Sequence, residues 1–164
     1  MVKALKIGLS LLGLVLLIVI AIAPIAPIAP IGPLPGLFIG GTSTTAPEQW
    51  PDTTDVDEIR LRVPGVLPRV VIIWVVESAG DLHVVGARDS GWVSMLGEGG
   101  PVEMRLGDST YPLRAVAVHE GFEDVLTAYV DKYRAEYPDI IAGFPSVEAA
   151  RTQVAVLRLE RPAG

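Results

Sequence analysis

From residue 58 onward, hydrophobic and polar positions follow the patterns of β-strands. Between Glu58 and Val63 charged and apolar residues alternate, which predicts a strand with one buried face and one wet face. Two apolar runs follow, residues 70–76 and 82–87, joined by Ser78-Ala79-Gly80-Asp81. Runs rich in Val and Ile around a Gly/Asp turn predict a β-hairpin.

Residues 92–118 continue with a short helical turn and two more strands. Trp92, Met95 and Leu96 are spaced three and four apart, so they share one face of a single helical turn, which the glycines at 97–100 end. Residues 102–106 alternate again, and a Gly-Asp-Ser turn leads into the apolar-rich residues 110–118. Both stretches are typical of strands.

The hydrophobic period changes to that of a helix after residue 121. Apolar side chains recur there at intervals of three and four, which predicts an amphipathic helix of about four turns that ends by Pro138. These side chains are Phe122, Val125, Leu126, Tyr129, Val130 and Tyr133. Pro145-Ser146 is typical of the start of a short helix. In residues 152–159, Ala155, Leu157 and Leu159 share one face, which predicts a final strand.

Six strands with one long helix near the C-terminal end define the predicted fold class. It is mainly β (α+β): a small six-stranded antiparallel barrel packed against that helix, over residues 58–164. About 100 residues are enough for one modest core.

The N-terminal pattern is different. The stretch from Leu5 to Ala23 holds no charge, and its 19 residues span roughly 28 Å as a helix, enough to cross a bilayer core. We therefore expect a transmembrane anchor at residues 1–23. The alternative is a secretory signal cut after Ala21-Ile22-Ala23, which Pro24 directly after the cut disfavours.

Loop charge predicts the orientation of this anchor. Lys3 and Lys6 precede the span, and acidic residues come first after it. The positive-inside rule then places the N-terminus in the cytoplasm and the domain outside the cell membrane, as a single-pass protein. A domain facing the cytoplasm is the alternative.

Residues 24–57 are predicted to be a proline-rich spacer and a polar linker. Prolines at 24, 27, 30 and 33 repeat every third residue, which excludes an α-helix and favours a stiff polyproline II rod. A docking ligand for a proline-binding module is the alternative. Residues 40–57 turn polar, as linkers do; Trp50 within them would rest either on the membrane interface or on the domain.

Composition excludes several kinds of site. The chain has no cysteine and only two histidines, His83 and His119, so thiol chemistry and a multi-histidine metal site are excluded, and we expect no metal. Without Lys3 and Lys6 it carries 11 basic and 19 acidic residues, which argues against nucleic-acid binding.

The globular part resembles a known family. The residues that carry the likeness are Gly65-Val66-Leu67-Pro68-Arg69, the hairpin, Ser90-Gly91-Trp92 with Leu96, residues 102–118, Asp131-Lys132-Tyr133-Arg134 and Tyr137-Pro138. Over residues 58–161 the chain resembles the split-barrel flavin and deazaflavin oxidoreductases, which include the pyridoxamine-phosphate-oxidase-like proteins and the deazaflavin-dependent nitroreductases.

The resemblance implies a cofactor, a deazaflavin (coenzyme F-420) or FMN, lying along the barrel wall. By position, the resemblance assigns its binding to Arg69, Arg88, Ser90, Gly91 and Trp92. The two arginines would each donate a pair of hydrogen bonds to phosphate oxygens. Where the nitroreductases have two basic residues and a serine, this chain has Val63, Pro64 and Val66. A homodimer is a further expectation from the family.

Each of these residues also has a purely structural interpretation. Arg69 would be a solvated charge at a strand end, and Trp92 a lid on the core. His83 lies between two apolar residues of a strand and is expected to face solvent. No nucleophile elbow surrounds Ser90, so a hydrolase triad with Asp89 and a histidine is disfavoured.

Two function classes remain open. One is a membrane-tethered deazaflavin- or flavin-dependent oxidoreductase that transfers hydride to an unknown small molecule, in which the cofactor supplies the chemistry. The other is a non-catalytic, membrane-tethered split-barrel module that binds a ligand or a protein. The missing basic residues and the outward topology favour the second.

Overall fold

A computed structural model of the chain describes residues 29–32 and 34–162. The predicted anchor from Leu5 to Ala23 lies outside these residues. No helix within them is both long and apolar enough to span a bilayer. The strands are β1 (Thr42–Ser43), β2 (Glu58–Val63), β3 (Arg69–Ser78), β4 (Asp81–Ala87), β5 (Gly99–Leu106), β6 (Ser109–Ala117) and β7 (Val154–Glu160). The helices are α2 (Gly91–Leu96), α3 (Phe122–Arg134), α4 (Pro138–Ala142) and α5 (Val147–Gln153).

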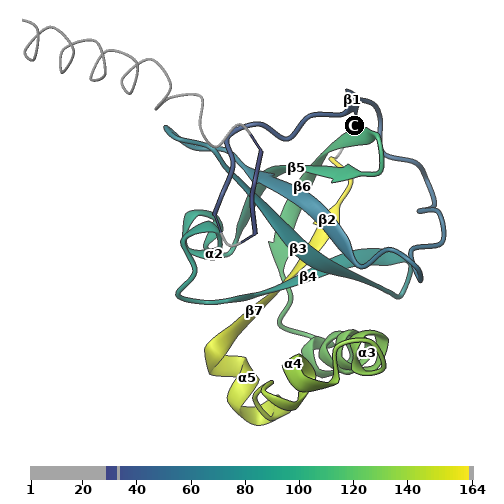
Figure 1. Cartoon of the computed structure of the whole chain (residues 1–164), viewed down its shortest axis with the longest axis vertical. Helices are drawn as coiled ribbons and strands as arrows, with labels where there is room; N and C mark the ends of the chain where they lie inside the picture. Colours follow the sequence, from purple (N-terminus) through teal and green to yellow (C-terminus); the bar gives the residue numbers. More distant parts are fainter. Residues whose placement is uncertain (1–28, 33, 163–164) are drawn as a thin grey trace, which may run out of the picture.

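Strands β2 to β7 form a closed antiparallel barrel (Figure 1). The order around it is β6-β5-β2-β3-β4-β7, and a direct pairing of β6 with β7 closes the ring. The short β1 adds to the outer side of β6 in parallel. Closure removes the open sheet edges that would otherwise invite pairing with other chains. The predicted six-stranded antiparallel barrel is confirmed.

The barrel interior is filled by every second residue of each strand. On β2 these are Ile59, Leu61 and Val63, and the register of the ladders puts Val71 and Val75 of β3 on the same side. Aliphatic side chains fill the rest: Leu82, Val84, Val102, Met104, Leu113, Leu157 and Leu159. The interior is therefore a packed core rather than a ligand cavity.

A second core covers the outer face of β3, β4 and β7. Val76, Val85 and Val156 point outward there and pack against the buried face of α3, and Figure 1 shows α3, α4 and α5 gathered below this side of the barrel. Trp74 stacks on Tyr133 with ring centroids 4.3 Å apart. Strand β3 is thus covered on both faces, which explains its unbroken apolar run.

Strand β3 changes partner at Val75. Its residues up to Trp74 pair with β2, and those from Val75 pair with β4. The N–H of Val75 donates to the carbonyl of Asp57 and to the Tyr133 hydroxyl (3.2 and 3.0 Å), and its carbonyl accepts from that hydroxyl and from Lys132 Nζ (2.7 and 2.9 Å). Side chains of α3 therefore satisfy the backbone where the β2 ladder ends.

The helical predictions hold with one change at a boundary. The amphipathic helix is present as α3, with its apolar stripe buried. It ends at Arg134, however, and Pro138 occupies the first turn of α4, a position where its missing N–H costs nothing. The short helix after Pro145 is also present: the Ser146 side chain accepts from the Ala149 N–H and caps α5 (3.4 Å).

The described part of the region predicted to be a spacer and linker, residues 24–57, packs on the barrel from Ile39 onward. Ile39, Trp50 and Thr53 are buried, and β1 pairs with β6 through residues 42 and 43. Lys132 Nζ donates to the carbonyls of Thr53 and Val56 (2.9 and 2.8 Å). Trp50 meets Tyr111 edge to face at 5.3 Å, so it rests on the domain.

The described end of the proline-rich spacer is a tight turn rather than a polyproline rod. Ile31 and Leu34 exchange two backbone hydrogen bonds (3.1 and 3.0 Å) around Gly32, whose φ is +53°. The chain then returns along β3, where Gly36 exchanges hydrogen bonds with Val70 (2.8 and 2.7 Å). A β-carbon on Gly36 would lie 2.7 Å from the carbonyl carbon of Ala29, so only glycine fits this fold-back.

We expect Tyr133→Phe to lower the free energy of unfolding by about 1–3 kcal/mol, because it removes the hydroxyl that bonds the Val75 backbone. Urea unfolding of the full chain in detergent micelles, followed by tryptophan fluorescence, measures this. Tyr111→Phe is the matched control: the structure gives the Tyr111 hydroxyl no hydrogen bond among the described residues, and its loss should change stability by less than about 0.5 kcal/mol. Equal losses would contradict the assignment.

Candidate functional site

Arg69 lies at one end of the barrel interior. It is the first residue of β3 and pairs with Val63, so its side chain starts on the inward face. Its guanidinium lies directly against Gly91 of α2: a β-carbon on that glycine would overlap Nη1 and stand 2.9 Å from Cζ. Among the ion pairs of the described residues, none involves Arg69. The structure thus brings Arg69 and Gly91 together.

Trp92 is part of the barrel core. Its exposed fraction is 7 %, and it belongs with Val93 and Leu96 to the apolar face that α2 turns into the barrel. Its ring lies on Gly86 of β4, where a β-carbon would overlap the indole. Of the two interpretations of Trp92, the structure supports the lid on the core, because both its burial and Gly86 leave little of the ring for a ligand.

The other two predicted residues form hydrogen bonds within the elbow between β4 and α2. The Ser90 hydroxyl donates to the carbonyl of Ala87 (2.7 Å). Arg88 is held to the end of α5: its backbone N–H donates to the carbonyl of Gln153 (2.9 Å) and its Nε to that of Arg151 (3.3 Å). These bonds fix the elbow, and they leave the terminal nitrogens of Arg88 without a described partner.

A narrow cleft lies beside the elbow. Its volume is about 130 Å³, and the residues that line it include Arg88, Val93, Ser94, Glu98, Val118 and His119. His119 Nε2 lies 2.9 Å from a Glu98 carboxylate oxygen. Drug-sized ligands occupy about 300–1,000 Å³, so this cleft holds only a small group. Sequence reasoning missed it, because the turn after α2 and the end of β6 meet only in the folded chain.

His83 does not face solvent, contrary to the sequence-based prediction. It lies on the outer face of β4 between Val76 of β3 and Arg158 of β7, and its exposed fraction is 4 %. Its Nδ1 is 3.1 Å from the carbonyl oxygen of Asp81. Burial lowers the pKa of His83 below its usual value of 6.5, since the interior disfavours the charged imidazolium.

Groups that could bind a metal do not converge in the described part of the chain: no cluster of three or more His, Asp or Glu side chains occurs there. The predicted cofactor contacts fall into two sets. Arg69 lies against Gly91, and Arg88 lines the cleft, so both arginines lie near the elbow. Ser90 instead forms a hydrogen bond within the elbow, and Trp92 packs in the barrel core.

Comparison with known proteins yields structural neighbours only. No family model matches the chain, and no curated protein matches it. Among solved structures, HutZ, the heme storage protein from Vibrio cholerae, aligns with a TM-score of 0.45 and 13 % identity over 66 % of this chain and 83 % of its own. A NimC/NimA family protein from Clostridium acetobutylicum aligns with a TM-score of 0.40 and 16 % identity, over 63 % and 73 %.

Replacement of Gly86 by alanine should destabilise the protein by about 1–3 kcal/mol, because the new methyl group must displace the Trp92 ring. Urea unfolding measures the loss, and a red shift of tryptophan emission would report the displaced ring. Gly100→Ala is the control. Gly100 also faces the barrel interior, but its β-carbon would meet only Leu96 Cδ2 at an ordinary 3.6 Å. Unchanged stability of the Gly86 variant would contradict the packing described.

The buried His83 predicts a loss of stability in mild acid. Below pH 6.5 the unfolded chain binds a proton at this residue while the folded chain does not, so stability should fall as the pH drops from about 6.5 toward the lowered folded pKa. Thermal unfolding between pH 8 and pH 5 tests this. His83→Asn removes the titration and should flatten the profile in that window; an unchanged slope would show that other groups cause it.

Proposed function

We propose that this chain is a membrane-tethered split-barrel module that binds a small phosphate-bearing ligand at the elbow between β4 and α2. The observation that carries the proposal is the position of Arg69, whose guanidinium lies on Gly91 without a carboxylate partner among the described residues. Arg88, three residues before Gly91, adds a second guanidinium on the same loop. Guanidinium groups offer planar pairs of N–H donors that match phosphate oxygens.

The charge balance supports this assignment. The chain is acidic, with a formal net charge of −6, and carboxylates neutralise most of its arginines. These pairs are Arg62–Glu103, Arg105–Asp108, Arg134–Asp131, Arg151–Glu123, Arg158–Glu160 and Arg161–Asp81. An arginine held against a glycine with no such partner keeps its hydrogen-bonding capacity for an anion.

Binding is better supported than catalysis. The aliphatic side chains of the described strands fill the barrel, and the only titratable pair at the cleft is Glu98 with His119, both largely exposed. Guanidinium groups are chemically suited to the phosphate of a flavin or deazaflavin, and Arg88 lines the cleft while Arg69 lies against Gly91. The ring system of such a cofactor does not fit a cleft of about 130 Å³ or the buried face of Trp92. Within one chain, the described residues therefore match the phosphate end of such a cofactor but give its ring no site.

The remaining parts of the proposal follow from the sequence. The stretch from Leu5 to Ala23 would hold the protein in the cell membrane, with the N-terminus in the cytoplasm and the barrel outside. A homodimer, implied by the resemblance, would place a second chain where the ring of a cofactor could rest. A reductase using coenzyme F-420 or FMN is the function expected if such a ring site exists.

Titration of the full chain in detergent micelles with FMN and with reduced deazaflavin, followed by cofactor fluorescence, tests the proposal. Inorganic pyrophosphate serves as a ringless competitor. Because charge-assisted hydrogen bonds contribute about 1.5–3 kcal/mol, Arg69→Ala should weaken binding by about ten- to a hundredfold. Arg69→Lys should recover only part of the affinity, since an ammonium cannot bind in the same forked geometry.

Arg114→Ala is the matched control, because Arg114 is exposed on β6 and forms no ion pair among the described residues. It should bind as the wild type does. Full displacement of FMN by pyrophosphate would identify the phosphate as the recognised group. No binding at micromolar concentrations, or equal weakening by the Arg69 and Arg114 variants, would refute the proposal.

A further inference from the structure

One side of the barrel carries most of its exposed large apolar side chains. Of eight such residues in the described chain, six lie on three segments: the N-terminal segment, the turn between β2 and β3, and α2. We name these six the apolar pole: Ile31, Leu34, Phe38, Val66, Leu67 and Met95. The other two, Ile140 and Val147, belong to α4 and α5.

Direct contacts join the three segments. A β-carbon on Gly65 would stand 2.9 Å from Met95 Cε, so α2 touches the turn between β2 and β3. Gly36 pairs with Val70 just after that turn, which attaches the N-terminal segment at the same place. In Figure 1 these parts occupy the left-hand side of the barrel, where the chain enters the described structure. These contacts place the three segments side by side, with Phe38 at the edge next to Arg62 and Glu103.

The turn between β2 and β3 is unusual for an exposed loop. Its sequence is Pro64-Gly65-Val66-Leu67-Pro68; Val66 is fully exposed and the exposed fraction of Leu67 is 77 %. Exposed turns are normally built from Gly, Pro, Asn, Asp and Ser. Two large aliphatic side chains at the tip of a hairpin are instead typical of a loop that inserts into a lipid bilayer.

The pole is also free of charge. Residues 29–47, 63–68 and 90–97 contain no Asp, Glu, Lys or Arg, although 20 % of the chain is charged. Burial of a charged side chain in lipid costs several kcal/mol, whereas exposed aliphatic groups gain from it. Charged side chains lie only at the edge of the pole: Arg62 and Glu103 lie beside Phe38. Arg69 follows directly behind the turn, and a long basic side chain at that depth can reach lipid phosphates.

The predicted membrane anchor lies only a few residues before the pole in the sequence. The uncharged stretch from Leu5 to Ala23 is separated from Ala29 by five residues, which span at most about 20 Å when extended. An anchor in the membrane therefore keeps the pole within about 20 Å of the interface. We propose that the apolar pole docks on the lipid bilayer, with Val66 and Leu67 inserted between the headgroups.

This inference rests on the tether in the proposed function, but not on ligand binding at Arg69. It fixes the orientation of the barrel: the pole faces lipid, and α3 to α5, below the barrel in Figure 1, lie on a different side. The elbow with Arg69 and Gly91 then opens close to the membrane surface. The ligand of that site would have to arrive along the interface.

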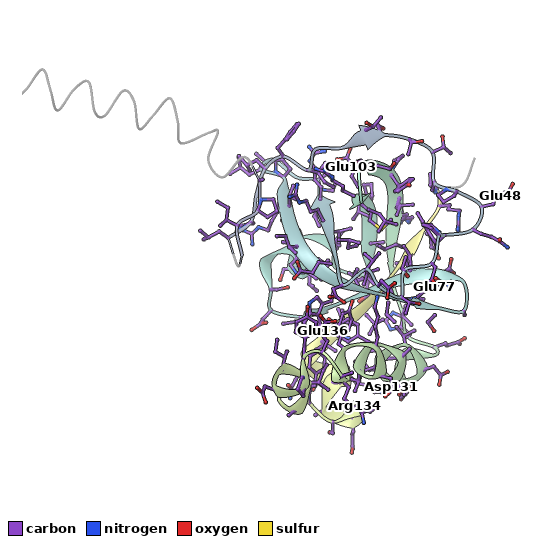
Figure 2. The ribbon with its side chains drawn as sticks, turned by 45° about the vertical axis from the view of Figure 1, so that its right-hand side comes forward. Glu48, Glu77, Glu103, Asp131, Arg134 and Glu136 are labelled. Carbon is purple, nitrogen blue, oxygen red and sulfur yellow. The ribbon has the colours of Figure 1, made fainter. Side chains whose placement is uncertain are left out.

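The test uses single cysteines, since the chain has none of its own. Leu67→Cys places an environment-sensitive fluorophore in the pole. Asp131→Cys places the same fluorophore on the exposed side of α3, at the bottom of Figure 2. The full chain is reconstituted into phosphatidylcholine nanodiscs, one chain per disc, with or without lipids that carry a nitroxide quencher in the upper acyl chain.

Docking predicts a blue-shifted Leu67 label that loses about half of its emission or more to the quencher, as expected for an interfacial residue. The Asp131 label should be unaffected. With a Met95→Cys label as the readout, Val66→Asp with Leu67→Asp should abolish quenching without loss of folding, since both side chains are exposed.

Two outcomes would overturn docking. The first is a Leu67 label that is no more quenched than the Asp131 label while the chain co-elutes with the disc. The second is a Leu67 label that is shielded from lipid only when two chains share a disc, which would mean that a second copy covers the pole. Failure of the chain to enter discs at all would instead refute the tether.

Discussion

The exchange of partners by β3 at Val75 is the constraint on which the rest of the molecule depends. A strand that leaves one ladder and joins another exposes backbone groups at the crossing, and buried groups of this kind must be hydrogen-bonded. Here the α3 side chains Lys132 and Tyr133 bind both polar atoms of Val75. The side chains of α3 thus satisfy the β3 backbone at the point where its ladder with β2 ends.

The same two side chains connect the barrel to the residues before it. Lys132 also binds the carbonyls of Thr53 and Val56, and Tyr133 can donate to that of Asp57. Burial lowers the pKa of Lys132, while the nearby carboxylate of Asp57 opposes the shift. An ammonium with three carbonyl acceptors fixes residues 53–57 against β3, and the segment from Ile39 to Trp50 then lies along the barrel. One helix thus builds the second core and holds residues 53–57 against the barrel.

Sequence patterns predicted what depends on local periodicity. The alternation in β2 and the two-sided apolar run of β3 gave the barrel strands, and the spacing from Phe122 to Tyr133 gave α3. The packing of Trp50 and the burial of His83 were not predictable, because each depends on a partner distant in the chain: Tyr111 for Trp50, and the pairing of β4 with β3 and β7 for His83. From its sequence alone, a polar, proline-containing stretch is interpreted as a linker, because the residues it contacts in the fold are not known.

The candidate site follows the same division between local and distant causes. The resemblance singled out Arg69 and Gly91, and the fold joins them because α2 closes the barrel end where β3 begins. The burial of Trp92 depends on a distant residue, since Gly86 has no side chain and leaves room for the indole in the core. A residue that the barrel needs for closure cannot also offer its face to a ligand. What remains available at this end is a guanidinium beside an uncharged apolar surface, an arrangement that matches an anionic headgroup above a hydrocarbon layer as well as a soluble phosphate.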